Sequence, residues 1–150
     1  MTVALSLENI VGELEASVPG SIEEVSEKDI WIDMNRIHEV CSFLKQAQDI
    51  ELNFLVAISA VDYIEYFELV YHLQSIKHNH SLVIKSKCWG RDDISVSSVV
   101  DIWRGADFQE REIYDLMGIS FTNHPNLKRI MLWEGFPGHP QRKDYFEPPR

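Results

Sequence analysis

Residues 54–76 read FLVAISAVDYIEYFELVYHLQSI, and residues 80–89 read HSLVIKSKCW. In the first stretch, four apolar side chains alternate with their neighbours, namely Phe67, Leu69, Tyr71 and Leu73 against Glu68, Val70, His72 and Gln74. A period of two is typical of β-strands, because successive side chains point to opposite faces of a sheet. The polar residues 77–80, KHNH, predict a hairpin turn between the two stretches. The sequence therefore predicts a sheet built around this hairpin.

Two helices and a short hairpin are predicted before this sheet. Residues 6–20, SLENIVGELEASVPG, place apolar side chains at helical spacing, with Ser6 as N-cap and a Pro-Gly stop. Short alternating apolar stretches around a polar turn in residues 21–35 predict a β-hairpin. Residues 35–48, NRIHEVCSFLKQAQ, predict a second helix for which Asn35 is a good N-cap.

After the sheet, residues 97–103, SSVVDIW, predict another strand, and residues 105–118, GADFQEREIYDLMG, predict a helix that Gly118 ends. This order favours an α+β fold of two layers, with helices packed on a mixed β-sheet. We assign residues 1–132 to the α+β domain. We assign residues 133–150 to an extended, Pro/Gly-rich C-terminal interaction arm.

The helix predicted at residues 105–118 has two different faces. Ile113, Leu116 and Met117 fall on the side that faces the sheet. The opposite side carries Phe108 among four charged residues, which are Arg104, Arg111, Glu112 and Asp115. Such a face is either solvated, with ion pairs of about 0.3–0.5 kcal/mol each, or a charge-balanced surface that another protein covers. Periodicity alone leaves both interpretations open.

The C-terminal arm combines residues that rarely occur together. Its Pro and Gly residues prevent a helix or a central strand. It nevertheless carries aromatic and basic side chains, namely Trp133, Phe136, Tyr145 and Phe146 with Arg142 and Lys143. Disordered tails are poor in aromatic residues, whereas protein interfaces are rich in aromatic residues and arginine. We expect the arm to bind a partner; the alternative is that it folds back over its own domain.

Charge and cysteine content exclude several kinds of partner. Residues 1–120 hold 9 Lys and Arg against 21 Asp and Glu, whereas residues 121–150 hold 5 against 3. An acidic body repels phosphates, so we expect no binding to nucleic acid and none directly to anionic lipid. Cys41 and Cys88 form no CxxC pair, so we expect no iron-sulfur cluster in this chain. Two isolated cysteines are also typical of a protein from a reducing compartment. Cys41 is most simply a small core residue of its helix.

No membrane-spanning segment is predicted either. The longest apolar runs are shorter than the ~20 residues that cross a bilayer, and the first residues do not resemble a signal peptide. We therefore expect a cytoplasmic protein whose membrane association comes only through a partner.

Catalytic and metal-binding interpretations are weaker. Glu110, Glu112 and Asp115 could form an acid/base pair, but the sequence offers no nucleophile beside them. His78 and His80 with Cys88 suggest a metal site, yet their spacing matches no zinc pattern, and a polar hairpin turn explains them better. No phosphate-binding loop is present. We predict no catalytic, cofactor or metal residue in this chain.

Two stretches carry a family resemblance. Residues 106–132, ADFQEREIYDLMGISFTNHPNLKRIML, followed by residues 138–145, GHPQRKDY, resemble the signature of the 30-kilodalton subunit of respiratory complex I. This complex is the proton-translocating NADH:quinone oxidoreductase, NDH-1. The resemblance runs from Trp103 to Tyr145, and ISAVDY, YHLQS and VSSV upstream are similar to the family too.

The resemblance implies an α+β protein whose C-terminal portion lies along the 49-kilodalton subunit of the hydrophilic arm. It implies no bound flavin, iron-sulfur cluster or quinone, since these belong to neighbouring subunits. It also implies packing and interface roles for the signature residues Glu110, Arg111, Glu112, Asp115, His124, Pro125, Arg129, His139, Pro140, Arg142, Lys143, Asp144 and Tyr145. Arg104 and Phe136 join this partner interface from the helix face and the arm.

The resemblance leaves the electron donor open. The same module is similar to subunits of ferredoxin-linked photosynthetic complexes, deazaflavin-linked archaeal dehydrogenases and membrane-bound nickel-iron hydrogenases. Residues 103–112, WRGADFQERE, are close to the photosynthetic form. In each case we expect a peripheral subunit on the cytoplasmic side of the membrane.

Overall fold

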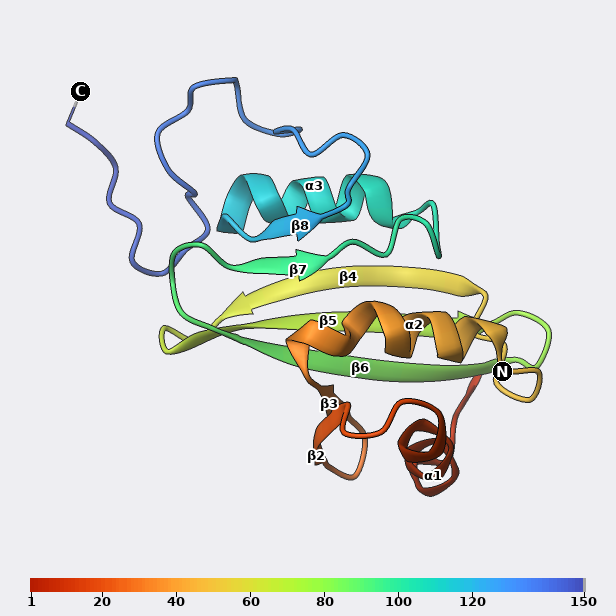
Figure 1. Ribbon diagram of the computed structural model, residues 1–150. Coiled ribbons are helices and arrows are strands. Elements are labelled where there is room, and N and C mark those ends of the chain that lie inside the picture. Colours follow the sequence, from red (N-terminus) through yellow and green to blue (C-terminus); the bar gives the residue numbers. More distant parts are fainter. Residues whose placement is uncertain (150) are drawn as a thin grey trace.

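The computed structural model describes residues 1–149, and Figure 1 shows how they are arranged. In that range, six strands form one mixed sheet around the antiparallel pair β5 (Tyr66–Ser75) and β6 (His80–Trp89). β4 (Phe54–Asp62) pairs antiparallel with β5, so the stretch 54–76 is two strands with a turn between them. The antiparallel register from Tyr66 opposite Trp89 to Ser75 opposite His80 confirms the hairpin prediction, and the alternating apolar side chains of β5 are buried.

The N-terminal elements complete the sheet and its helical layer. β1 (Val3–Ala4) and β3 (Ile30–Ile32) pair parallel with β6, and β2 (Ile22–Val25) pairs antiparallel with β3. α1 (Leu7–Ser17) and α2 (Ile37–Gln46) occupy the predicted helical stretches. In Figure 1, α2 lies in front of β5 and β6 and runs along them.

The prediction that Asn35 is the N-cap of α2 is wrong. A 3₁₀ turn, η1 (Met34–Arg36), precedes α2, and Asn35 lies inside it. The Asp33 carboxylate accepts the Asn35 backbone N–H at 3.0 Å and so caps this turn. Aspartate caps as well as asparagine does, and here it lies just before the turn that leads into the helix.

A second unit lies above the sheet in Figure 1. It contains α3 (Ala106–Met117) and a parallel pair of short strands, β7 (Ser95–Ser97) and β8 (Ser120–Thr122). Ile113, Leu116 and Met117 of α3 are buried, as the helical pattern predicted. Cys41 of α2 is a buried core residue, also as predicted. The α+β fold with a mixed sheet and packed helices is therefore confirmed.

The prediction of a strand at residues 97–103 is wrong beyond Ser97, where β7 ends. Val99 donates its backbone N–H to Glu110, and Val100 donates to the Ser98 hydroxyl. These side chains take the donors that a strand would need for its ladder. The chain turns instead, with the N–H groups of Ile102 and Trp103 bound to the carbonyl of Val99.

The C-terminal segment returns to the domain. It runs past α3 and comes back beside the β6–β7 connection (Figure 1). The Gln141 N–H donates to the Leu116 carbonyl at 3.0 Å, and the Lys143 N–H donates to Asp62 Oδ2 at 2.8 Å. Residues 139–145 thus follow the fold-back alternative, because the backbone donors of Gln141 and Lys143 find acceptors on the domain. The boundary at residue 132, between the α+β domain and the C-terminal arm, stays a prediction that residues 1–132 fold without the arm.

Candidate protein-binding surface

Asp115 of α3 anchors the chain that follows β8. Its side chain is fully buried, and its Oδ2 accepts backbone N–H groups from Ile130 at 3.1 Å, Met131 at 2.8 Å and Leu132 at 2.9 Å. Burial alone would raise the pKa of this carboxyl. The three N–H donors and the nearby Arg129 charge outweigh burial and hold the pKa below its ordinary value. The carboxylate therefore stays ionised and fixes residues 130–132.

The same residue holds the other end of the loop. His139 Nδ1 donates to the backbone carbonyl of Asp115 at 2.9 Å. Arg129 Nη2 also donates to the carbonyl of Gly138 at 2.8 Å. A compact loop whose two ends meet at one place is an Ω-loop, and such loops are frequently functional. We refer to residues 130–139 as the Ω-loop.

The Ω-loop exposes large apolar side chains. Met131 is 63% exposed and Trp133 is 65% exposed. The Trp133 ring meets the Phe136 ring edge-on at 5.6 Å, and the Arg129 guanidinium lies 5.8 Å from the centre of the Phe136 ring. This surface brings together aromatic residues and arginine, which are the residue types that carry most binding energy at protein interfaces.

α3 extends this surface. Phe108 is 64% exposed, and the Arg111 guanidinium lies 5.7 Å from its ring centre. Arg111 also donates to the carbonyls of Lys128 and Arg129, at 3.0 and 3.3 Å, and so joins the helix to the start of the loop. We define the binding surface by its members, which are Phe108, Arg111, Arg129, Met131, Trp133 and Phe136.

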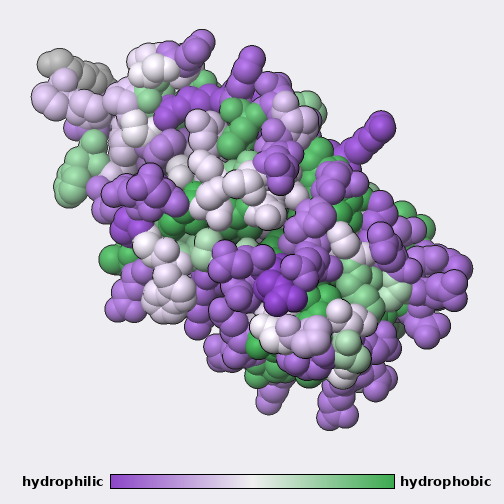
Figure 2. Space-filling model, viewed as in Figure 1, coloured by the Kyte–Doolittle hydropathy of each residue, from purple (hydrophilic) through white to green (hydrophobic). Residues whose placement is uncertain are grey.

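The surface is neither flat nor uniformly apolar. A hollow of about 400 Å³ lies beside it, lined by Tyr114, Leu127, Lys128, Arg129, Leu132, Glu134 and Gly135. In Figure 2, apolar side chains over the region of α3 and the C-terminal segment form separate patches between hydrophilic ones. Apolar anchors within a polar surround are typical of a protein-binding site.

The predicted interface residues occupy three environments. Those that are exposed are Arg104, Glu112, Pro125, Lys143 and Asp144. Those of intermediate exposure are Arg111, His124, Arg129, Phe136, His139, Pro140, Arg142 and Tyr145. Glu110 and Asp115 are buried. The charged helix face is thus divided, because the chain's own C-terminal segment covers the part that holds Asp115.

Glu110 is a second buried carboxyl on α3, and it faces the domain. It accepts the Ser98 hydroxyl at 2.6 Å and the Val99 N–H at 2.8 Å. Burial raises its pKa to about 7, although these two donors act in the opposite direction. Glu110 therefore joins α3 to the end of β7, and no partner can reach its carboxyl directly.

His124 and Pro125 belong to the turn that leads into the Ω-loop. His124 Nε2 lies 3.2 Å from the carbonyl of Asp107 and 3.2 Å from its carboxylate. His124 Nδ1 accepts the Asn126 N–H at 3.0 Å. This histidine ties the turn to the first turn of α3, so its role in the structure is to position the chain.

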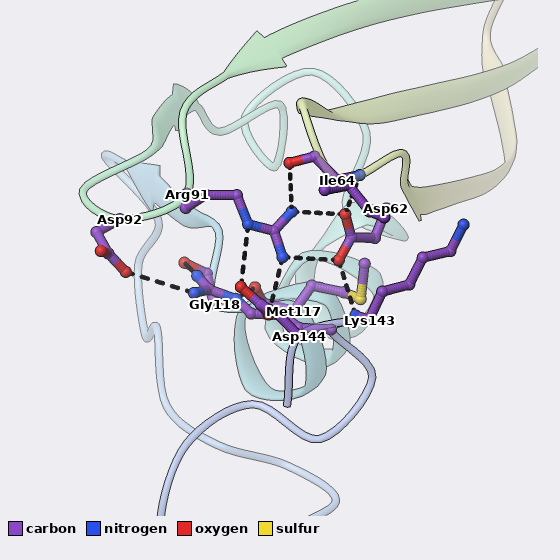
Figure 3. A network of polar contacts seen from close by, with 9 residues as sticks. Asp62, Ile64, Arg91, Asp92, Met117, Gly118, Lys143 and Asp144 are labelled. Carbon is purple, nitrogen blue, oxygen red and sulfur yellow. Dashed lines mark hydrogen bonds and ion pairs between the residues drawn. The ribbon is translucent and has the colours of Figure 1, made fainter. Parts of the chain in front are cut away.

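Two residues that hold the C-terminal segment were not predicted from the sequence. Asp62 ends β4, and Arg91 lies in the β6–β7 connection. Their side chains form an ion pair that also contacts Lys143 and Asp144 (Figure 3). The only signal was a single acidic residue after an apolar strand, within the ISAVDY stretch that resembles the family.

His78 and His80 lie at the β5–β6 turn, where both rings contact the backbone. Within residues 1–149, no group of three or more His, Cys, Asp or Glu side chains could hold a metal ion. The rings of His78 and His80 stack at 5.4 Å. His78 Nε2 contacts the carbonyl of Gln48, and His80 Nε2 contacts the carbonyl of Ile50.

Within residues 1–149, no helix is both long and apolar enough to cross a membrane.

Known proteins share this fold and parts of this sequence. Residues 30–149 match the family model described as "Respiratory-chain NADH dehydrogenase, 30 Kd subunit". The chain is 36% identical over 149 residues to an NADH-quinone oxidoreductase subunit of Roseiflexus castenholzii, covering 95% of this chain and 85% of that protein. It is 45% identical over 113 residues to an NADH-quinone oxidoreductase subunit of Rhizobium etli, covering 73% of this chain and 59% of that longer protein.

Two solved structures are similar. The trypsin-resistant fragment (1-134) of Nqo5 matches with a TM-score of 0.63 and 30% identity, over 81% of this chain and 98% of the fragment. A chain of the membrane-bound sulfane sulfur reductase, an archaeal respiratory membrane complex, matches with a TM-score of 0.73 and 26% identity. The latter match covers 93% of this chain and 85% of that chain.

Proposed function

Because the chain belongs to the 30-kilodalton subunit family of the respiratory-chain NADH dehydrogenase, we propose that it is a non-catalytic assembly subunit of the hydrophilic arm of NADH:quinone oxidoreductase. Its partner in this proposal is the 49-kilodalton protein, together with other subunits of that arm. The complex would lie on the cytoplasmic side of the membrane, with this chain attached through its partners.

The exposed Ω-loop is the observation that carries this proposal. Two of its large apolar side chains, Met131 and Trp133, are more than half exposed while the loop's ends are fixed on α3. A soluble domain gains little from holding such side chains in water, whereas a partner that covers them gains apolar contact area at low entropic cost. We assign the same role to Phe108, Phe136 and the two arginines beside them.

The absence of catalysis in this chain is part of the proposal. Burial raises the pKa of the Cys41 thiol far above its ordinary range and that of Cys88 to about 12. Metal and iron-sulfur ligation needs thiolates, which such burial disfavours. In this proposal, flavin and iron-sulfur clusters lie in neighbouring subunits, and this chain supports electron transfer from NADH to quinone only by holding those subunits together.

A second candidate function has one observation in its favour. A similar chain occurs in the membrane-bound sulfane sulfur reductase, which is a respiratory membrane complex other than NADH:quinone oxidoreductase. The chain could serve as the equivalent subunit of a related complex, linked to ferredoxin, deazaflavin or a nickel-iron hydrogenase. The proteins that co-purify with the tagged chain distinguish these cases, because NADH-binding subunits appear only in the first.

The first prediction concerns Trp133 and Met131. In membranes that contain the tagged chain, Trp133→Ser combined with Met131→Ser should reduce recovery of the 49-kilodalton protein at least about tenfold, because hot-spot aromatic residues carry about 2 kcal/mol or more. Ile76→Ser is the matched control, since Ile76 is 66% exposed in the β5–β6 turn, away from the binding surface. Equal recovery with all variants would contradict the proposal.

A further inference from the structure

The C-terminal end of α3 receives its cap from a distant part of the chain. The last carbonyls of a helix have no partner within it. Here the Gln141 N–H donates to Leu116 at 3.0 Å, Arg142 Nε donates to Met117 at 2.6 Å, and His139 donates to Asp115. The Arg142 charge also complements the negative end of the helix dipole. Residues 139–142 therefore act as a C-cap.

One carboxylate holds this cap in place. The Asp62 side chain is 2% exposed and accepts four donors (Figure 3). Arg91 donates two of them, from Nη1 at 2.5 Å and Nη2 at 2.9 Å; the backbone N–H groups of Ile64, at 2.7 Å, and Lys143, at 2.8 Å, supply the others. Hydrogen bonding to Arg91 is the largest reason that the pKa of Asp62 lies far below its ordinary range. The carboxylate is thus ionised at every physiological pH.

Arg91 connects this carboxylate to the C-terminal segment. Its Nη2 lies 2.8 Å from the carboxylate of Asp144, and its Nη1 donates to the carbonyl of Ile64 at 3.2 Å. The guanidinium groups of Arg91 and Arg142 lie 4.5 and 5.4 Å from the centre of the Phe67 ring. We call Asp62, Arg91, Lys143 and Asp144 the clasp.

The clasp continues into the Ω-loop. Tyr145 follows the clasp directly, and its hydroxyl donates to the carbonyl of Pro137 at 3.0 Å. Its ring lies so close to Gly138 that a Cβ there would approach it to 2.8 Å. Holding residues 143–144 therefore places Tyr145 against Pro137 and Gly138, at the second end of the loop.

We propose that Asp62 and Arg91 are positioning residues for the binding surface, because they close the C-terminal segment on the domain and so hold the Ω-loop ordered before a partner arrives. This inference rests on the proposed function. Asp115 fixes the first end of the loop, and the second end is held both by the bond from His139 to the Asp115 carbonyl and, through Tyr145, by the clasp. A loop that is ordered in advance loses less conformational entropy when it binds.

The test uses the full chain with Asp62→Asn, which keeps the shape and removes the charge. Hydrogen exchange of residues 133–145 in the free chain should become about tenfold faster or more, because the charge-assisted bonds to Arg91 are lost. Amides of β5 and β6 should be unchanged. Recovery of the 49-kilodalton protein with the tagged chain should fall. Glu65→Gln, an exposed acid in the same turn, should alter neither measurement.

A second variant guards against unfolding of the domain. Asp144→Asn removes only the outer part of the clasp, since the Asp144 side chain is 55% exposed, and should accelerate exchange by a smaller factor over the same residues. Unchanged exchange in both variants, or faster exchange with full recovery of the partner, would overturn the positioning role. If the wild-type chain itself recovers no 49-kilodalton protein, the proposed function fails and the positioning role falls with it.

Discussion

Glu110 and Asp115 lie five residues apart on α3 and are both buried, but their carboxyl groups have opposite pKa shifts. Asp115 has three backbone N–H donors and Arg129 beside it, so the ionised form is favoured. Burial is the largest cause of the raised pKa of Glu110; one hydroxyl and one N–H donor oppose it without outweighing it, and the charges of Asp107 and Asp101 raise the pKa further. At the residue scale, burial, the number of donors and the sign of neighbouring charges decide the protonation state.

This difference predicts how stability depends on pH. The pKa of Glu110 rises from an ordinary 4.5 to about 7 on folding, so its protonated form is favoured in the folded state. Its contribution to the free energy of unfolding is complete below pH 4.5 and is lost as the pH rises through about 7, a change of about 3 kcal/mol. Denaturant unfolding of the wild type between about pH 5 and about pH 8 should show this decrease.

Glu110→Gln should flatten that profile. A glutamine carbonyl can still accept the Val99 N–H, and its amide can donate to the Ser98 hydroxyl, without a group that titrates. The variant should therefore gain stability over the wild type above pH 7. Glu112→Gln, an exposed site on the same helix, serves as control. An identical pH profile for wild type and Glu110→Gln would refute the assignment.

At the scale of elements, the end of α3 depends on Gly118. This residue has φ 75° and ψ 23°, a left-handed conformation that glycine adopts readily. A Cβ at this position would lie 2.5 Å from Arg142 Nη2 and 2.6 Å from His139 Cδ2. Glycine therefore serves both the backbone turn and the close approach of the two capping side chains.

Gly118→Ala should lower the free energy of unfolding by about 1–2 kcal/mol or more, because alanine is strained there and displaces the cap. Exchange of residues 139–145 should accelerate with it. Gly12→Ala in the exposed middle of α1 has free space around its Cβ and should instead stabilise by about 0.5–1 kcal/mol. Two alanine variants with the same stability change would count against a capping role for Gly118.

The elements also show what the sequence could and could not predict. Local periodicity of apolar residues predicted helices α1, α2 and α3 and the β5–β6 hairpin. Each of these elements buries one apolar face, and that burial is what the periodicity reflects. The prediction of a strand at residues 97–103 was wrong because Glu110, from the next helix, accepts the hydrogen bond of the Val99 N–H. The clasp joins Asp62 to Lys143, which are 81 residues apart, and single polar contacts at such a distance leave no periodic pattern.

At the scale of the whole molecule, the formal net charge of −10 is concentrated in the first 120 residues. The binding surface differs from that body, since Arg111 and Arg129 lie among its aromatic rings. The fold places this surface on the outer side of α3 and on the Ω-loop, where Asp115 and the clasp fix both ends of the loop. The aromatic and arginine anchors that the sequence indicated remain a prediction, and the sequence left two alternatives for the arm, of which residues 139–145 follow the fold-back one.

Footprinting of side chains with hydroxyl radicals tests the central claim most directly, because methionine and tryptophan side chains react when solvent reaches them. Met131 and Trp133 are 63% and 65% exposed in the chain alone, so both should be labelled strongly in the free protein. In the complex purified from membranes, both should lose their labelling, while Ile76 should react equally in the two samples. Strong labelling of Met131 and Trp133 in the intact complex would contradict the claim that the Ω-loop binds a partner protein.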